Sequence, residues 1–287
     1  MLLTCLCASS MITCFSSKTM ISAIFCKCEV CEFAREHKGK EWRTQLQTVL
    51  DEGELLIDFP GDSFLHQWQH DIDFNDIEHL LLTHWHGDHL YAEDLALRIS
   101  GYGQDLEKVL HVYGSPFTKT FYDRAFELEG RFDESRLVYH TIRAYNPIEI
   151  SRYKVYPIPA QHGNFQEDCL IYAIVDRETG KSLFYTHDTG MPLEKDLEYL
   201  ATQGIVFDFV SLDCTGQGFE QSGPVHMSLK ENVHLIEKMR QLGLVHDETI
   251  YVASHFSHNG GLNHEAMQAL SEADGILTSY DGMEIEF

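Results

Sequence analysis

The sequence predicts an α/β fold, a four-layer αββα sandwich in which two mixed sheets pack together and helices cover the outside. Short apolar runs typical of strands form meanders early in the chain and alternate with helical periodicity later. Histidine and aspartate recur directly after these runs, as they would at strand ends. The 287 residues contain no linker-like stretch, so we expect one domain over residues 1–287, with a cysteine-rich structural metal site near 26–31.

The first half of the chain is expected to contain strands separated by short helical segments. The opening apolar segment, which Ser and Thr interrupt, is interpreted as a first strand and loop. Further strands are predicted from apolar or alternating runs at residues 54–58, 79–83, 109–113 and 137–143. Helical spacing predicts a short turn at 31–37, a turn at 71–78, and helices at 91–100 and 115–126.

The second half alternates more regularly between the two kinds of pattern. Strands are predicted at residues 152–159, 169–175, 183–186, 207–212, 249–254 and 283–287. Helices are predicted at 192–203, 228–242 and 263–273. His162, Asp188 and His255 each follow one of these strands, which suggests that they meet at one edge of the fold.

The six residues His84-Trp85-His86-Gly87-Asp88-His89 place three imidazoles and a carboxylate directly after the apolar run at 79–83. These side chains are good ligands for a divalent cation. His84 and His86 stand two residues apart, which fits a strand edge or tight loop and excludes the helical metalloprotease pattern, where the spacing is four. If two of these four side chains point in one direction and two in another, they would suit two neighbouring metal ions. A histidine-rich surface loop is the simpler alternative.

Charge and cysteine content restrict the classes of function. Lys and Arg number 21 against 45 Asp and Glu, and the formal net charge of −24 repels polyanions, so we do not expect a nucleic-acid partner. The apolar opening has no Lys or Arg before Lys18 and is too interrupted to span a bilayer. We therefore expect a cytoplasmic protein without a membrane partner. Its eight cysteines are interpreted as reduced core thiols plus a metal site.

The Thr-His-x-His-x-Asp-His pattern after a hydrophobic strand resembles the signature of the metallo-β-lactamase superfamily, whose members are mostly di-metal hydrolases. The resemblance implies that His84, His86 and His162 hold one ion. It implies that Asp88, His89 and His255 hold the other and that Asp188 bridges both. Taken singly, His162 or His255 could be an ordinary loop histidine, and His187 competes with Asp188. The ligand types allow Zn²⁺, Mn²⁺ or Fe²⁺.

Two such ions would bring the pKa of a shared water toward neutrality and clamp the attacking and leaving oxygens of an in-line displacement. A metal-bound hydroxide would then attack without a nucleophilic side chain. Besides binding metal, Asp88 is a candidate for orienting the attacking water.

The segment Cys26-Lys27-Cys28-Glu29-Val30-Cys31 offers three thiolates to one ion, and a closed structural zinc site needs a fourth ligand. We expect His258 to supply it, because the loop that carries His255 could turn His258 outward; Cys14 is the alternative. Three unconnected cysteines remain the competing interpretation. With the His84 motif, this cluster resembles the phosphoribosyl cyclic phosphodiesterases of bacterial phosphonate breakdown.

That branch resemblance extends over most of the chain from Cys26 onward. It includes Ala34-Arg35, Thr186 to Gly190 followed by Pro192, Leu212-Asp213-Cys214, the SHFSH segment and residues 281–285. It implies that His226 acts as a general acid or phosphate contact, for which a pKa near 6.5 is suitable. A loop residue before the helix that Ser228 caps is the alternative. Members of this branch usually have a glycine-rich turn after the first strand, whereas this chain has no glycine before Gly39 and has Ser9-Ser10 and Ser16-Ser17 in that region.

These patterns favour a di-metal phosphodiesterase that acts on a small cyclic or diester phosphate, with a homodimer as a possible assembly. A tRNA 3′-end nuclease shares the histidine motif, but the net charge of −24 and the cysteines count against it. A thioester or lactone hydrolase is a third candidate, and a metal or thiol sensor is the non-enzymatic one. An oxygen-reducing di-iron protein is disfavoured, because such proteins usually have Glu at the position of His86.

Overall fold

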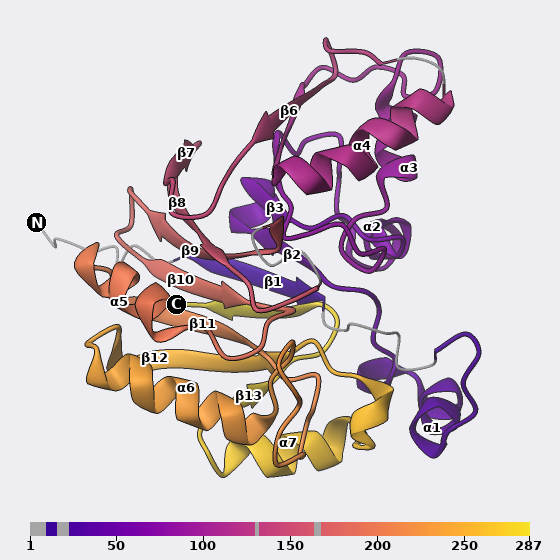
Figure 1. Cartoon of the computed structure of the whole chain (residues 1–287). Helices are drawn as coiled ribbons and strands as arrows, with labels where there is room; N and C mark the ends of the chain where they lie inside the picture. Colours follow the sequence, from indigo (N-terminus) through magenta and orange to yellow (C-terminus); the bar gives the residue numbers. More distant parts are fainter. Residues whose placement is uncertain (1–9, 16–22, 130–131, 164–167) are drawn as a thin grey trace, which may run out of the picture.

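The computed structural model describes residues 10–15, 23–129, 132–163 and 168–287. Two seven-stranded sheets pack face to face and helices lie on the outer surfaces, which confirms the predicted four-layer α/β sandwich (Figure 1). No helix in the described ranges is long and apolar enough to cross a membrane. The predicted first loop, with Ser9, Ser16 and Ser17, and the cysteines Cys5 and Cys7 lie outside the described residues.

The first sheet has the strand order β14-β1-β2-β3-β4-β5-β6. Its strands are β1 (Met11–Phe15), β2 (Gln47–Leu50), β3 (Leu55–Ile57), β4 (His79–Leu81), β5 (Leu110–Gly114), β6 (Leu137–Thr141) and β14 (Met283–Glu286). Strands β3 to β6 are parallel, while β14, β1, β2 and β3 pair antiparallel. The last strand of the chain therefore lies beside the first.

The second sheet has the order β13-β12-β11-β10-β9-β8-β7. Its strands are β7 (Ile148–Ile150), β8 (Tyr153–Pro159), β9 (Leu170–Asp176), β10 (Ser182–Thr186), β11 (Phe207–Asp213), β12 (Val245–Ser254) and β13 (Leu277–Thr278). Strands β10 to β13 are parallel, and β7 to β10 form an antiparallel meander. Both sheets are mixed, as the sequence predicts.

The helices are α1 (Glu29–His37), α2 (Ser63–His70), α3 (Ala92–Leu95), α4 (Pro116–Glu129), α5 (Glu194–Thr202), α6 (Leu229–Gln241) and α7 (His264–Glu272). Helices α2 to α4 lie on the outer side of the first sheet and α5 to α7 on that of the second, while α1 lies beyond one end of the sandwich (Figure 1). Short 3₁₀ turns occur at Gly39–Glu41, Asp51–Gly53, Ala96–Arg98 and His258–Gly260. Helix α6 begins with a capping box, in which the Ser228 side chain accepts from the Glu231 N–H and the Glu231 carboxylate accepts from Ser228.

Three apolar clusters lie between the layers and pack them together. Leu81, Tyr185 and Phe209 belong to the cluster between the sheets. Leu80, on the opposite face of β4, packs with residues of α3 and α4. A third cluster joins the outer face of the second sheet to α5, α6 and α7. Because successive strand residues point to opposite faces, the short apolar strands are buried on both sides, which explains their uninterrupted apolar character.

Some local predictions were wrong. The expected turn in residues 71–78 is present at 74–76, whereas the predicted helix 91–100 is reduced to α3 and a 3₁₀ turn. The N–H of Gly103 bonds to the Leu97 carbonyl, which ends the helical hydrogen-bond pattern there. Helix α2 was not predicted, because Ser63 and His66 are its only buried residues and neither belongs to an apolar stripe.

Candidate metal centre

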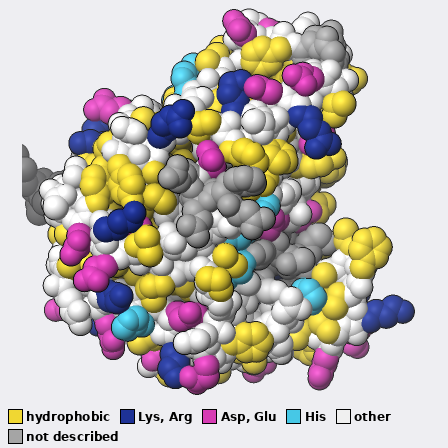
Figure 2. Space-filling model, in the orientation of Figure 1, with side chains coloured by type: hydrophobic (Ala, Val, Ile, Leu, Met, Phe, Trp, Pro, Cys, Tyr) yellow, Lys and Arg dark blue, Asp and Glu magenta, His cyan; other side chains and the backbone are white. Residues whose placement is uncertain are grey.

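The segment 84–89 folds into a tight loop after β4. Asp58 N–H bonds to the Leu81 carbonyl at 2.9 Å, which ties the end of β4 to the end of β3. The N–H groups of His89 and Leu90 both bond to the His86 carbonyl, at 2.9 and 2.7 Å. This turn directs several imidazoles to the same side, and Figure 2 shows histidine side chains near the centre of the visible face.

A first group of potential ligands consists of His84, His86, His162 and Asp188, whose ligand atoms lie within 4.8 Å of one another. His86 Nδ1 lies 2.8 Å from His84 Nε2 and 3.1 Å from His162 Nε2. Asp188 Oδ2 lies 3.1 Å from His84 Nε2 and 3.4 Å from His162 Nε2. The structure therefore brings together four residues from three separate loops.

A second group consists of Asp88, His89, Asp188 and His255. Asp188 Oδ2 lies 3.0 Å from His89 Nε2, and Asp188 Oδ1 lies 3.4 Å from His255 Nε2. Asp88 Oδ2 is 3.8 Å from His89 Nε2. Because Asp188 belongs to both groups, the seven residues form one continuous histidine–aspartate cluster with the shared carboxylate at its centre.

The backbone at two of these residues is unusual. Asp188 and His255 have φ angles of 51° and 62°, a region that residues other than glycine seldom adopt. Such conformations cost free energy and persist where the surrounding structure enforces them, often at functional sites. Both residues follow buried parallel strands, β10 and β12, so strain at the strand ends turns their side chains toward the cluster.

The outer ring nitrogens of four cluster histidines are held by the protein. His89 Nδ1 donates to Asp58 Oδ2 at 2.7 Å, and His162 Nδ1 donates to the Val225 carbonyl at 3.2 Å. The same pattern joins His84 Nδ1 to Thr83 Oγ1 at 3.1 Å and His255 Nδ1 to Thr215 Oγ1 at 2.8 Å. An Nδ1 that carries the proton leaves the Nε2 lone pair for a metal ion, and such outer partners typically orient metal-binding histidines.

The ring nitrogens and carboxylate oxygens that face the centre of the cluster are better suited to binding a cation than to contacting one another. His89 Nε2 and His255 Nε2 are buried, and each faces an oxygen of the buried Asp188 carboxylate, at 3.0 and 3.4 Å. Nitrogen lone pairs and carboxylate oxygens this close repel unless a proton or a metal ion lies between them. Burial of such charged and polar groups is costly unless an ion or a proton compensates for it. The residues present therefore fit two divalent cations.

Burial and neighbouring charges set the ionisation of the cluster. Burial opposes ionisation of Asp188, but His255 and hydrogen bonds from His84 and His89 hold its pKa well below its ordinary value. Burial also lowers the pKa of His84 well below its usual range. Against the same burial effect, Asp58 and Asp88 raise the pKa of His89 well above its usual value. A cation would replace the proton that His89 otherwise holds.

His226 lies beside the second group rather than within it. Its Nδ1 is 3.2 Å from Asp188 Oδ1 and 3.3 Å from Asp213 Oδ2. Asp213 is fully buried and accepts N–H bonds from Thr215 and Met227, both at 3.0 Å. His187, considered from sequence as a competitor of Asp188, instead directs Nε2 to Ser211 Oγ at 2.5 Å.

Sequence reasoning did not assign a role to several supporting residues. Asp58 is the last residue of the strand predicted at 54–58, Asp213 belongs to a matching segment, and Thr83 opens the histidine motif, but no separate role follows from these positions. Thr215 belongs to no motif identified from the sequence. The Thr83 hydroxyl donates to Asp58 at 2.9 Å, and the Thr215 hydroxyl lies 3.3 Å from Asp213. The available signal was the repeated occurrence of an aspartate at the end of a buried strand.

A second, separate cluster consists of Cys26, Cys28, Cys31 and His258, and we call it the cysteine cluster. Cys26 Sγ and Cys28 Sγ lie 3.3 and 3.6 Å from His258 Nδ1. Burial opposes the thiolate of Cys28, but hydrogen bonds from the Cys31 backbone and from His258 lower its pKa to about 6. Three thiols and an imidazole match the donor set of a structural zinc site.

Cys14, the alternative fourth ligand, lies elsewhere. It belongs to β1, is fully buried in the apolar cluster between the sheets, and burial raises the pKa of its thiol to about 12. A neutral thiol of this kind behaves as a small apolar side chain. Among the described residues His258 alone joins the three cysteines, and it lies three positions after His255 of the histidine–aspartate cluster.

Comparisons with known proteins describe the fold further. A sequence model of the beta-lactamase superfamily domain matches residues 54–256, which include all seven residues of the histidine–aspartate cluster. No curated protein matches the chain by sequence. The chain is similar to the solved structure of a diphosphatase from the PhnP family, with 22% identity and a TM-score of 0.72 over 98% of each chain.

Two further solved structures have the same fold. PqqB from Methylobacterium extorquens, determined with bound Zn²⁺, is 15% identical with a TM-score of 0.71 over 96% of this chain and 99% of that one. The short form of human tRNase Z is 15% identical with a TM-score of 0.67, covering 96% of this chain and 98% of the human one. At these identities the similarity establishes the architecture.

Proposed function

Because this chain belongs to the beta-lactamase superfamily, as its histidine motif predicts, we propose that it is a di-metal-dependent phosphodiesterase for a small cyclic or diester phosphate. The observation that carries this proposal is the pair of ligand groups that share Asp188. His84, His86 and His162 would hold one divalent cation, and Asp88, His89 and His255 the other. Two cations would supply Lewis acidity toward a phosphate ester and a nucleophile at neutral pH.

We assign the orientation of the attacking water and the protonation of the leaving oxygen to two residues of the chain. Asp88 is the more exposed of the two carboxylates in the cluster, with a side chain 17% exposed, and would orient the attacking water. His226 borders the cluster through Nδ1, which Asp213 and Asp188 hold, so Nε2 is the atom that would protonate the leaving oxygen. The similarity of fold to a PhnP-family diphosphatase supports a phosphate ester as the substrate.

We further propose that the cysteine cluster holds a structural Zn²⁺. Its four donor atoms lie within 4.8 Å of one another. Four protein ligands complete the coordination of a structural Zn²⁺, which needs no open position for a substrate. Arg35 helps to fix the segment, since its guanidinium donates to the carbonyls of Ala23 and Cys26 at 2.9 and 2.5 Å. Through the His255 to His258 loop, this ion would brace the catalytic cluster.

Hydrolysis of bis-p-nitrophenyl phosphate tests the proposed activity. The metal-stripped protein is assayed with added Mn²⁺, Zn²⁺ or Fe²⁺, and we expect hydrolysis that a chelator abolishes. His86→Ala should remove the activity, whereas His246→Ala, at the opposite end of β12 from His255, should retain it. Absence of hydrolysis with every metal would overturn the proposal.

A tRNA 3′-end nuclease is the second candidate, because the fold is also that of human tRNase Z. The net charge of −24 counts against it, since binding of nucleic acid depends strongly on contacts between cations and phosphates. A precursor tRNA and a panel of thioesters and lactones, assayed beside the phosphodiester, separate these activities. Turnover of the precursor tRNA or the carboxylic esters without the phosphodiester would favour those alternatives.

A further inference from the structure

Three histidines of the first sheet belong to neither metal-binding cluster and have no role in the proposed activity. They are His79 on β4, His111 on β5 and His140 on β6, which are neighbouring parallel strands. His79 is paired in register with His111, and His140 is paired with Tyr113, two residues after His111. Because residues two apart on a strand point to the same face, all three imidazoles project from one face of the sheet.

This face turns toward the second sheet but is only partly covered at these positions. Leu81, two residues after His79, belongs to the apolar cluster between the sheets, whereas the three histidines are partly exposed. His79 begins β4 and His84 follows its end, so the length of the strand separates them from the histidine–aspartate cluster. A small ion from solvent can therefore reach these rings without entering that cluster.

The rings of His111 and His140 face each other. His111 Nδ1 lies 2.9 Å from His140 Nε2. Two imidazole nitrogens bound to one Zn²⁺ at about 2.0 to 2.1 Å lie about 2.9 to 3.4 Å apart when they occupy neighbouring coordination positions. Without an ion, one ring donates its N–H to the lone pair of the other. The observed separation therefore suits a metal ion as well as it suits a shared proton.

Tyr113 and His79 complete the arrangement. The Tyr113 ring stacks on His140, with centroids 4.7 Å apart and an angle of 17° between the ring planes. The Tyr113 hydroxyl lies 3.4 Å from His79 Nδ1. The His79 ring is centred 5.7 Å from that of His111, so a rotation of the partly exposed His79 side chain brings a third nitrogen toward the pair.

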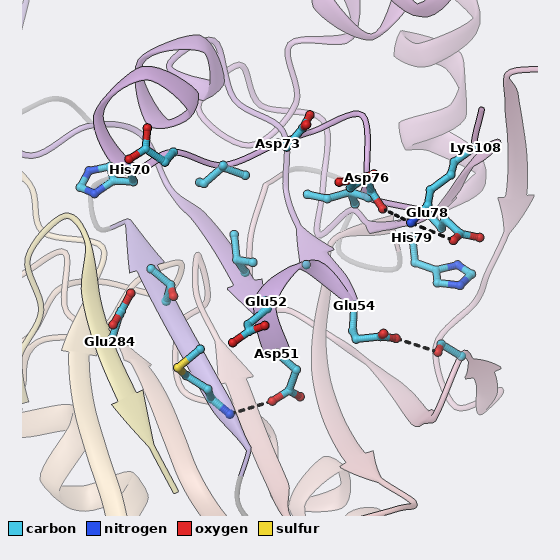
Figure 3. A pocket seen from close by; sticks show the side chains of 18 of the residues that line it. Asp51, Glu52, Glu54, His70, Asp73, Asp76, Glu78, His79, Lys108 and Glu284 are labelled. Carbon is cyan, nitrogen blue, oxygen red and sulfur yellow. Dashed lines mark hydrogen bonds and ion pairs between the residues drawn. The ribbon is translucent and has the colours of Figure 1, made fainter. Parts of the chain in front are cut away.

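An acidic cavity of about 1080 Å³ adjoins these histidines, and His79 is one of its lining residues. Eight of the lining residues are Asp or Glu, and Glu54 and Glu78 act electrostatically on His79, which Figure 3 shows at one end of the cavity. Lys108, which also lines the cavity, pairs with Glu78 at 3.3 Å. A wall with this excess of negative charge raises the local concentration of cations.

We propose that His111 and His140, with His79 as a third ligand, bind a Zn²⁺ ion at a site separate from the two clusters already described. The proposal goes beyond the phosphodiesterase function and does not rest on it. Imidazole ligands suit Zn²⁺, Cu²⁺ and Ni²⁺, whereas Mg²⁺ and Ca²⁺ prefer oxygen ligands. Water fills the remaining coordination positions, so this histidine site is open to solvent, unlike the closed cysteine cluster.

Zinc binding to the full chain tests the proposal. Protein that has been loaded with Zn²⁺ and freed of excess metal is titrated with further Zn²⁺, and calorimetry and equilibrium dialysis give the number of ions bound. We expect the wild type to bind one ion more per chain than the double variant His111→Asn with His140→Asn. His79→Asn should weaken this binding at least about tenfold, the smallest loss that is typical even of outer partners.

His234→Asn is the matched control, because His234 is an exposed histidine of α6, and it should bind as many ions as the wild type. Circular dichroism and the melting temperature show whether the asparagine variants are folded. Because the result is a difference between variants, it holds whatever number of ions the other two clusters bind and whether or not a phosphodiester is hydrolysed. Equal numbers of ions in the wild type and the folded double variant overturn the proposal.

Nuclear magnetic resonance of the histidine ring nitrogens provides a second readout in the wild type itself. Further Zn²⁺ should shift the ring nitrogen signals of His111 and His140, while Mg²⁺ should leave them in place, because imidazole binds the first ion and not the second. This measurement decides the question even if the double variant does not fold. Ring signals of His111 and His140 that do not respond to Zn²⁺ overturn the proposal.

Discussion

The histidine–aspartate cluster and the cysteine cluster lie at the two ends of one loop, from His255 to His258, yet they are built differently. His84, His89 and Asp188 are at most 1% exposed, and the outer nitrogens of the histidines are held by the fold. In the cysteine cluster Cys31 is buried, while the other three ligands are partly exposed. The first cluster is shaped by surrounding layers, and the second by one short segment and one histidine.

This difference suggests that the histidine–aspartate cluster serves catalysis and the cysteine cluster serves stability. A cluster whose ligands are oriented by outer partners can keep its geometry while metal-bound groups change during a reaction. A cluster of thiolates in a half-exposed segment gains its order from the ion itself, so binding and local folding are coupled. We therefore expect damage to the first to abolish catalysis and damage to the second to affect mainly stability.

Replacement of the shared carboxylate should have the largest effect. Asp188→Asn removes the negative charge common to both ligand groups, and we expect kcat to fall at least about a thousandfold, beyond the 10- to 100-fold loss typical of outer partners. Asp208→Asn is the control, because Asp208 is bonded to the Ser182 N–H at the other end of the sheet. Steady-state kinetics and metal content measure both. A kcat within tenfold of wild type would contradict the shared role.

Replacement of a residue that hydrogen-bonds the outer nitrogen of a cluster histidine should have the second-largest effect. Asp58→Asn keeps the size of the side chain but removes the charge that holds His89 Nδ1 at 2.7 Å, so we expect metal affinity to fall about 10- to 100-fold. Competition titration with a chromogenic chelator measures the affinity. Asp62→Asn, whose carboxylate accepts from the Gln45 N–H, is the neighbouring control. Equal affinities in the two variants would show that the cluster does not depend on its outer partners.

The cysteine cluster provides the contrasting result. Cys28→Ala should remove the metal ion bound there and lower the melting temperature, while kcat falls less than about tenfold because the other cluster keeps its outer partners. Elemental analysis should show one ion fewer per chain. Cys169→Ala, in the core outside the cluster, should keep the metal content and lose only packing. A complete loss of activity in a folded Cys28→Ala variant would contradict the proposal that the cysteine cluster contributes mainly to stability.

A buried histidine outside both clusters should give the smallest effect, in the pH dependence of folding. Burial, with a smaller contribution from His70, lowers the pKa of His66 to about 3, and its ring bonds to Thr44 and Gln47. Because the unfolded histidine titrates near 6.5, its stabilising contribution is complete above about pH 6.5 and is lost as pH falls toward 3.

The free energy of unfolding should thus decrease by up to about 1.4 kcal/mol per pH unit for this group between those values. Urea unfolding of wild type and His66→Gln at several pH values measures the slope, and the variant should show a shallower one. His234→Gln, on the exposed surface of α6, should leave the slope unchanged. Identical slopes in wild type and His66→Gln would show that His66 does not titrate as its burial implies.

Much of the fold could be predicted because its strands are short, apolar and bounded by turn residues. The segments around β5, β8 and β11 are of this kind, and each lies within a few residues of its predicted position. Helix α2 could not be predicted, because what holds it is a polar network in which His66 contacts Thr44 and Gln47. Those contacts exist only after β2 and α2 have come together, so no local periodicity records them.

The sequence by itself determined which side chains could bind metal, since His84 to His89 and Cys26 to Cys31 are contiguous and their chemistry can be recognised without a fold. Only the tertiary structure decided how they are held. It brought Asp58 to His89 across 31 positions and His258 to Cys26 across 232. The reason is physical: ligand identity is a property of single side chains, whereas orientation depends on strand pairing and burial that join distant parts of the chain.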